Sequence, residues 1–214
     1  MKNTNLLIEL KDISFSYPDG TKVISNFNLK LKKGDKTALK GENGSGKTTL
    51  LEIITGLLVP NSAEIFVCGK KCCKEKDFQN ARKNLGFLFQ NPDDQLFCPT
   101  VAEEIAFGLF NLGKKRSEIE QIVSEILRKF DITHLKNTIT YHLSEGEKHI
   151  VALTAILAME PEVLLLDEPN TALDEKAENR LVSILKNLNK TILVVSHDDR
   201  FIEQITNKTI ELQK

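Results

Sequence analysis

Residues 36–56, KTALKGENGSGKTTLLEIITG, have the pattern of a short strand, a glycine-rich loop and a helix that stops at Gly56. The loop, residues 41–48, contains the complete G-x-x-x-x-G-K-[ST] pattern. Its glycines allow successive backbone N–H groups to point at phosphate oxygens, and the helix that follows adds its positive N-terminal end. This stretch therefore predicts a binding site for a nucleoside triphosphate.

The side chains of this loop predict how the nucleotide is held. The Lys47 ammonium group is long enough to reach the β- and γ-phosphates, and the Thr48 hydroxyl is expected to bind Mg²⁺. We therefore expect a nucleoside triphosphate as the ligand and Mg²⁺ as its cofactor. The loop residues expected to contact them are Asn43, Gly44, Ser45, Gly46, Lys47, Thr48 and Thr49.

A second stretch supplies two adjacent carboxylates. Residues 163–169, VLLLDEP, are an apolar strand followed by Asp167 and Glu168. Such a strand is expected to be buried, so it would deliver the Asp167 carboxylate rigidly to Mg²⁺, opposite Thr48. Glu168 would then orient or deprotonate the attacking water, a role that requires a carboxylate within hydrogen-bond reach of the nucleophile.

The rest of the chain predicts an α/β fold. Period-two alternation in residues 6–17 and 24–41 is typical of antiparallel strands, with a first turn at residues 18–20. Later strands alternate with helices, which indicates a P-loop NTPase core with a mainly parallel sheet flanked by helices. Amphipathic segments between residue 100 and about 130 predict two or three helices. We expect one domain over residues 1–214, in which about 1–89 and 160–214 form the core and β layer and about 91–158 form a helical subdomain.

Composition excludes some classes of protein. Lys and Arg total 29 and Asp and Glu total 30 in 214 residues, so no basic field indicates nucleic-acid binding. The apolar residues 150–166 are interrupted by Glu160 and Pro161, which leaves no expected membrane span, and the first residues do not resemble a signal peptide. We expect a cytoplasmic protein whose four cysteines, which lack paired C-x-x-C spacing, stay reduced.

Further motifs follow in a specific order. Gln90 follows GFLF, LSEGE occupies residues 143–147, TALD occupies residues 171–174, and His197 follows LVVS. With the phosphate loop and VLLLDEP, these segments resemble the Q-loop, signature, D-loop and switch histidine of the ATP-binding-cassette (ABC) ATPase family, over essentially the whole chain. The resemblance implies that Gln90 and His197 join Glu168 as catalytic residues and that Gln90 also binds Mg²⁺.

In that family two cassettes face each other head to tail, and each ATP lies between the phosphate loop of one and the signature of the other. The resemblance therefore implies a second ABC ATPase subunit as partner, in a homodimer or a heterodimer. Ser144 and Gly146 would contact the partner's nucleotide, helped by the helix N-terminus that begins there. Tyr17 lies where the family stacks an aromatic ring on adenine.

The signature departs from the family's usual Leu-Ser-Gly-Gly-Gln. Glu145 replaces the first glycine and Glu147 replaces the glutamine. Two alternatives follow for Glu145. Facing the γ-phosphate, it would repel the nucleotide and weaken the site. Turned to solvent or paired with Lys148, it would be a tolerated variation.

The stretch FQNPDDQLFCPTVAEEIAFGLFNLG, residues 89–113, resembles the importers of the energy-coupling-factor type and their cobalt or nickel relatives. This resemblance implies a peripheral protein on the cytoplasmic face of the cell membrane. It would dock on an integral membrane coupling protein, which works with a membrane component that binds the vitamin or metal ion. Residues 93–97 are the expected docking segment, unless Leu96 and Phe97 pack inside the helical insert. The C-terminal extension common in these ATPases is expected to be absent.

The alternative is a non-transport ABC ATPase that acts on DNA or on ribosomes. The segment between Gln90 and Leu143 is too short for the long coiled coil of the DNA-repair members, and the chain holds one cassette rather than two. A small-molecule kinase with the same phosphate loop would not explain Gln90, the signature and His197 together. We therefore expect no nucleic-acid partner.

Overall fold

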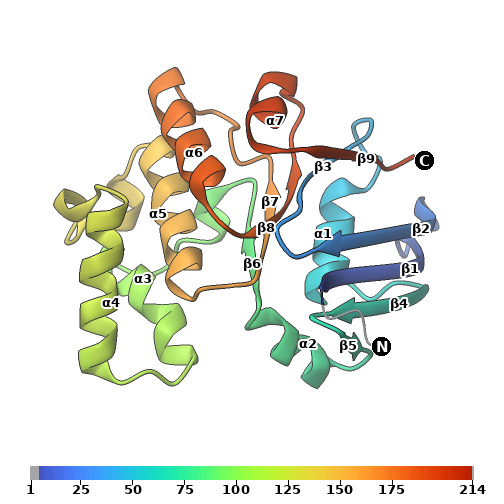
Figure 1. The fold of residues 1–214 in the computed structure, drawn as a ribbon, viewed down its shortest axis with the longest axis horizontal. Coiled ribbons are helices and arrows are strands. Elements are labelled where there is room, and N and C mark those ends of the chain that lie inside the picture. Colours follow the sequence, from blue (N-terminus) through green and yellow to red (C-terminus); the bar gives the residue numbers. More distant parts are fainter. Residues whose placement is uncertain (1–4, 214) are drawn as a thin grey trace.

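The computed structural model describes residues 5–213, which form two β-sheets with helices around them (Figure 1). The strands are β1 (Leu6–Ser16), β2 (Lys22–Lys32), β3 (Lys36–Lys40), β4 (Ser62–Val67), β5 (Lys70–Cys72), β6 (Leu85–Leu88), β7 (Val163–Asp167), β8 (Thr191–Val195) and β9 (Lys208–Glu211). The helices are α1 (Lys47–Thr55), α2 (Glu75–Arg82), α3 (Val101–Asn111), α4 (Arg116–Lys129), α5 (Glu145–Ala158), α6 (Glu175–Asn187) and α7 (Asp199–Ile205). Short 3-10 turns are η1 (Pro92–Asp94), η2 (Thr133–Leu135) and η3 (Thr140–His142).

The predicted combination of a parallel sheet and an antiparallel layer is confirmed. Five strands pair in parallel in the order β6-β7-β8-β3-β9, and four strands form an antiparallel sheet in the order β2-β1-β4-β5. In Figure 1 the antiparallel sheet lies at one end of the molecule, and α3, α4 and α5 lie at the other. Two helices, α3 and α4, form from the amphipathic segments near residues 100–130, as predicted.

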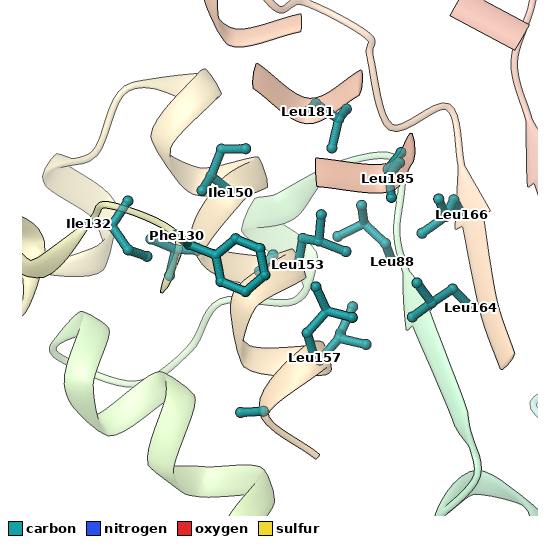
Figure 2. Packing of buried hydrophobic residues seen from close by; sticks show 14 of the residues in the cluster. Leu88, Phe130, Ile132, Ile150, Leu153, Leu157, Leu164, Leu166, Leu181 and Leu185 are labelled. Atoms are coloured by element: carbon teal, nitrogen blue, oxygen red, sulfur yellow. The ribbon is translucent and has the colours of Figure 1, made fainter. Parts of the chain in front are cut away.

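The parallel sheet separates two hydrophobic cores, which explains why residues 163–166 of its inner strand β7 are all apolar. On β7, Leu164 and Leu166 face a core shared with α3 to α7, whereas Val163 and Leu165 face a core shared with α1 and the antiparallel sheet. Successive side chains of a strand point to opposite faces, so both faces must be apolar when both are covered. Figure 2 shows the first core, where leucines of β6 and β7 meet side chains of α5 and α6.

Three local predictions differ from the structure. Residues 36–40, grouped with the antiparallel layer by their alternation, form β3 and pair with β8 and β9 in the parallel sheet. The sequence of residues 63–71, AEIFVCGKK, predicts one strand, but these residues span the hairpin β4–β5, whose turn residues Cys68 and Gly69 both have positive φ. Helix α2 was not predicted, because its polar sequence buries only Ala81 and so lacks an apolar stripe.

Among the described residues, no helix is both long and apolar enough to cross a lipid bilayer. All four cysteines lie in the described part of the chain and are free thiols. Burial raises the pKa of the Cys98 thiol to about 11, with the Glu104 charge adding to the effect. This thiol is therefore protonated at neutral pH and a poor nucleophile.

Candidate nucleotide-binding and catalytic site

Four neighbouring strands of the parallel sheet each end at one of the sequence motifs. The phosphate loop follows β3, Gln90 follows β6, Asp167 and Glu168 end β7, and His197 follows β8. Parallel strands place their carboxyl ends at the same edge of a sheet, where ligands bind in open α/β folds. The strand order β6-β7-β8-β3 therefore collects residues that are far apart in the sequence.

A cavity of about 650 Å³ opens at this edge. It brings together most of the predicted site residues, and Thr21, Val23, Thr171 and Val195 also line it. Three predicted residues do not line it: Ser45 is buried within the loop, and Ser144 and Gly146 line a separate cavity. The predicted residues that do line it are Tyr17, Asn43, Gly44, Gly46, Lys47, Thr48, Thr49, Gln90, Asp167, Glu168 and His197.

The conformation of the phosphate loop depends on glycine at two positions. Gly46 has φ 94° at the N-cap of α1, and a Cβ there would lie 2.3 Å from Cγ1 of Val23. Gly41 packs so closely that a Cβ would lie 2.6 Å from the Ser45 hydroxyl oxygen and from the Leu212 carbonyl oxygen. A larger residue at either position would move the loop away from the strands that support it.

Lys47 is the predicted phosphate-binding lysine of the loop, and it is buried. Its Nζ donates hydrogen bonds of 2.9 Å to the carbonyl oxygens of Gly41 and Glu42. These bonds hold the ammonium group over the loop, beside the cavity. The arrangement suits an anion such as phosphate, because an ammonium group in a partly desolvated loop attracts charge strongly.

Asp167 is 2% exposed, and its Oδ1 accepts no hydrogen bond from any described residue. Burial raises the pKa of Asp167 above its ordinary value, the charge of Glu168 adds to this, and the Thr48 hydroxyl and Lys47 oppose it. A buried carboxylate with a free oxygen beside a hydroxyl provides the hard oxygen ligands that Mg²⁺ prefers. The residues present therefore fit the expected ion.

Glu168 and His197 are in contact at the end of β7. The His197 backbone N–H donates to Glu168 Oε2 at 3.2 Å, and the ring Nε2 lies 3.2 Å from Oε1. The ring nitrogen and Oε1 are close but not hydrogen-bonded, because Oε1 accepts no hydrogen bond from any described residue. One carboxylate oxygen is thus anchored, and the other is buried with no hydrogen-bond partner among the described residues.

The backbone of Glu168 is strained, with φ 44°. Left-handed conformations of non-glycine residues cost free energy and persist where the surrounding structure enforces them, often at functional sites. Here the Glu168 N–H donates to the Val195 carbonyl at 2.9 Å, and its carbonyl accepts from Thr171 N–H at 3.1 Å. The turn directs the carboxylate away from the β7 axis and toward His197. No sequence pattern signalled this conformation.

Tyr17 lies at the rim of the same cavity, with 39% of its surface exposed. Its ring packs edge-on against Phe15, with centroids 5.0 Å apart, and its hydroxyl is 2.8 Å from the Thr49 hydroxyl. The ring is therefore held in place from two sides. The Thr49 contact was not expected from the sequence, since the two residues are 32 positions apart.

Ser144 and Gly146 line a separate cavity of about 640 Å³, between the start of α5 and the start of α6. Ser144 is the N-cap of α5, and its N–H and hydroxyl donate to the Glu147 carboxylate at 2.8 and 2.7 Å. Glu147 thus completes a capping box, for which glutamate serves as well as glutamine. The Ser144 hydroxyl holds the pKa of Glu147 below its ordinary value, so this carboxylate is ionised. Three basic residues that the motifs did not identify, His134, Lys176 and Arg180, also line this cavity.

Of the two alternatives for Glu145, the structure shows the ion pair. Glu145 Oε1 lies 2.9 Å from Nζ of Lys148, and its side chain is 48% exposed. Glu145 also lines the cavity beside Ser144. A carboxylate that is paired and half in water repels a neighbouring anion much less than an unpaired one.

A phosphate loop, a buried carboxylate pair and a histidine at the carboxyl edge of a parallel sheet define a P-loop nucleotide hydrolase. The profile of the ABC transporter family matches residues 24–171. This chain therefore belongs to the ABC transporter ATPase family, and it binds and hydrolyses ATP.

Relatives of this chain carry transport descriptions. It is 42% identical over 210 residues to an energy-coupling factor transporter ATP-binding protein, EcfA, of Methanothermobacter thermautotrophicus, covering 96% of this chain and 68% of the relative. It is 46% identical over 207 residues to a putative ABC transporter ATP-binding protein of Brucella suis, covering 97% and 86%.

Solved structures agree with this fold. The cbiO1 protein of Clostridium perfringens, described as part of the ABC transporter complex cbiONQ, superposes with a TM-score of 0.85 at 33% identity. The match covers 98% of this chain and 85% of cbiO1. The MJ0796 cassette, solved as a dimer, gives a TM-score of 0.86 at 27% identity over 97% of both chains.

Proposed function

We propose that this chain is the ATP-hydrolysing subunit of an energy-coupling-factor importer for a metal ion, such as cobalt or nickel, or for a vitamin. It would act as a dimer, on the cytoplasmic face of the membrane, docked on an integral membrane coupling protein. The observation that carries this subtype is the segment 91–97, NPDDQLF, which directly follows Gln90 in the sequence and presents an exposed aromatic residue, Phe97. The likeness to EcfA and to cbiO1 supports it.

Several residues of the cavity at the phosphate loop have a role in this proposal. Lys47 and the backbone N–H groups of the loop hold the phosphates, and the Tyr17 ring stacks on the adenine. Glu168 accepts the proton of the attacking water, and His197 helps to hold the γ-phosphate.

Thr48, Asp167 and Gln90 would hold Mg²⁺, which supplies positive charge to the phosphate oxygens when it is bound. Gln90 is exposed and lines the main cavity as well as a smaller one shared with Thr48 and Asp167, which supports including Gln90 in that group.

The two cavities correspond to two half-sites in a head-to-tail dimer. The cavity at the phosphate loop would bind one ATP, and the cavity at Ser144 would cover the γ-phosphate of the partner's ATP. The N-terminus of α5 carries positive partial charge, which suits that contact. The MJ0796 dimer supports this arrangement for the fold. We further propose that residues of about 91–158 move as a helical subdomain during this closure.

The residues of the expected docking segment have different environments. Asp93 pairs with Lys148, the Gln95 amide binds backbone groups at the end of β6, and Leu96 packs against the core. Phe97, in contrast, is 65% exposed and stacks edge-on against the half-exposed Phe107, with centroids 4.7 Å apart. Of the two apolar residues, Leu96 thus packs inside, whereas Phe97 is available to a partner. An exposed aromatic pair is suited to an apolar helix of a membrane protein.

Replacing Phe97 with Ser should cut the amount of integral membrane protein that co-purifies with the chain by about tenfold, since truncating a central aromatic anchor typically costs at least 1–2 kcal/mol. Basal ATPase activity should stay near that of the unmodified chain. The measurement is tagged purification from detergent-solubilised membranes, with mass spectrometry of the bound proteins.

Phe110→Ser is the matched control, because Phe110 is 54% exposed but lies at the other end of α3. Reversal of the charge at Asp93 would be a less specific probe, since it would also break the pair with Lys148. Equal recovery of the membrane protein with both variants would contradict docking at Phe97. Co-purification of nucleic acid in place of a membrane protein would favour a non-transport function.

Replacing Glu145 with Gly should change ATPase turnover by no more than about twofold, because an ion pair at this spacing whose carboxylate is half in water contributes only a few tenths of a kcal/mol. Lys148 would keep its pair with Asp93. The measurement is the ATPase rate against protein concentration for both forms at low and high salt. A large gain in rate at low salt only would show that Glu145 repels the nucleotide after all.

A further inference from the structure

Lys148 connects two segments that are separated by 55 residues in the sequence. Its Nζ lies 2.8 Å from Oδ1 of Asp93 and 2.9 Å from Oε1 of Glu145. The Lys148 side chain is 10% exposed, while the Asp93 and Glu145 side chains are 53% and 48% exposed. The ammonium group is therefore fixed between two carboxylates that remain in contact with water.

The two carboxylates belong to different functional regions of the cassette. Asp93 is in η1, three residues after Gln90, and η1 packs against α5. Glu145 is the first residue of α5 and lines the cavity beside Ser144. Lys148 is thus the ionic contact between the segment after Gln90 and the start of the signature helix.

The charges explain why a cation is needed at this point. Two carboxylates share one ammonium group, and the hydrogen bonds to Asp93 and Glu145 raise the pKa of Lys148, which stays charged. Without Lys148, Glu145 would present an uncompensated negative charge to the cavity at Ser144. An anion such as phosphate would then be repelled, since like charges a few ångströms apart disfavour each other.

We propose that Lys148 is a positioning residue with two effects. It allows the cavity lined by Ser144 to accept the partner's nucleotide, and it couples the binding of that nucleotide to the position of the segment after Gln90. In its pair with Glu145 it neutralises the variant residue of the signature. Because Lys148 also pairs with Asp93, its position beside Glu145 depends on the position of η1. Movement of η1 would therefore change the charge that the partner's γ-phosphate meets. This inference rests on the proposed head-to-tail dimer.

The test uses the full chain with Glu168→Gln as background and ATP with Mg²⁺ as the probe. ATP-dependent dimerisation is measured by sedimentation. Lys148→Gln should weaken it by about tenfold, which corresponds to about 1.4 kcal/mol. Lys148→Arg should stay near the background. Adding Glu145→Gln to Lys148→Gln should restore most of the affinity, which a purely structural role of Lys148 would not allow.

A second measurement is independent of dimerisation. Amide hydrogen exchange in the nucleotide-free chain should rise in peptides covering residues 91–97 and 144–148 together when Lys148 is changed to Gln. When Asp93→Asn is the added substitution, exchange should rise in both peptides. When Lys148→Gln is already present, adding Asp93→Asn should cause no further rise.

The proposal is overturned if the background dimerises with ATP but Glu145→Gln fails to rescue Lys148→Gln. It is also overturned if Lys148→Gln leaves exchange unchanged in either peptide. Absence of ATP-dependent dimers in the background itself would contradict the proposed homodimer. In that case the hydrogen exchange of the two peptides still tests whether Lys148 couples η1 to the start of α5.

Discussion

Glu168→Gln is expected to lower the ATP turnover of this protein by about 10²- to 10⁴-fold, the contribution of a general base, while leaving ATP binding intact. The glutamine amide has the same shape as the carboxylate and keeps an oxygen that can accept from the His197 N–H. It cannot accept the proton of the attacking water. An ATP-loaded dimer should therefore accumulate. Steady-state phosphate release and sedimentation with ATP measure both effects.

The control for this prediction is His197→Ala, which removes the ring beside Glu168 but leaves the carboxylate in place. It should lower turnover less than Glu168→Gln does, since it removes a contact rather than the base. Turnover of the Glu168→Gln variant close to that of the unmodified chain would remove Glu168 from the role of base. The buried position and strained backbone of Glu168 would then need another explanation.

Lys47→Ala is expected to act at an earlier step and to weaken ATP binding itself. The ammonium group would contact phosphate oxygens in the bound state and in the transition state alike, so its loss affects both. Hydrogen bonds to charged groups contribute about 1.5–3 kcal/mol, which predicts an affinity loss of roughly tenfold to 150-fold. Titration with ATP by calorimetry measures this loss directly, without any need for turnover.

Two controls separate lost phosphate contact from a damaged loop. Lys47 donates to the Gly41 and Glu42 carbonyls, so its removal leaves two backbone acceptors without that partner. The melting temperature without nucleotide reports this structural cost. Lys47→Arg keeps the positive charge and should bind ATP more tightly than Lys47→Ala. Unchanged ATP affinity in Lys47→Ala would contradict the assignment of the phosphate site.

Most of the candidate site was predictable from the sequence because its motifs are contiguous. The phosphate loop, the carboxylates of VLLLDEP and the signature each occupy a short run, in which local spacing alone defines the chemistry. Helix ends were predictable for the same reason. Helix α1 ends at Thr55 before Gly56, and α5 begins after Ser144, as local capping rules require. The sequence by itself thus determined the family and the ligand class, and it located the motifs that form the site.

Only the tertiary structure decided which of these segments meet. The chain order of the strands does not reveal that β6, β7, β8 and β3 are neighbours, and this arrangement is what gathers the motifs at one edge. Likewise, the sequence left two alternatives for Glu145. The choice depends on Lys148, whose second partner, Asp93, lies 55 residues away.

The physical reason is the range of the forces involved. Caps, turns and loop conformations arise from contacts between residues a few positions apart, so they are present in the sequence as patterns. Ion pairs and strand neighbours depend on where the hydrophobic cores place distant segments. Strand β7 illustrates this, because its apolar side chains enter the cores on both faces of the sheet. Its sequence does not indicate which strands lie on either side of it. Packing on both faces of the sheet determines that β8 lies next to β7, and this places Glu168 beside His197.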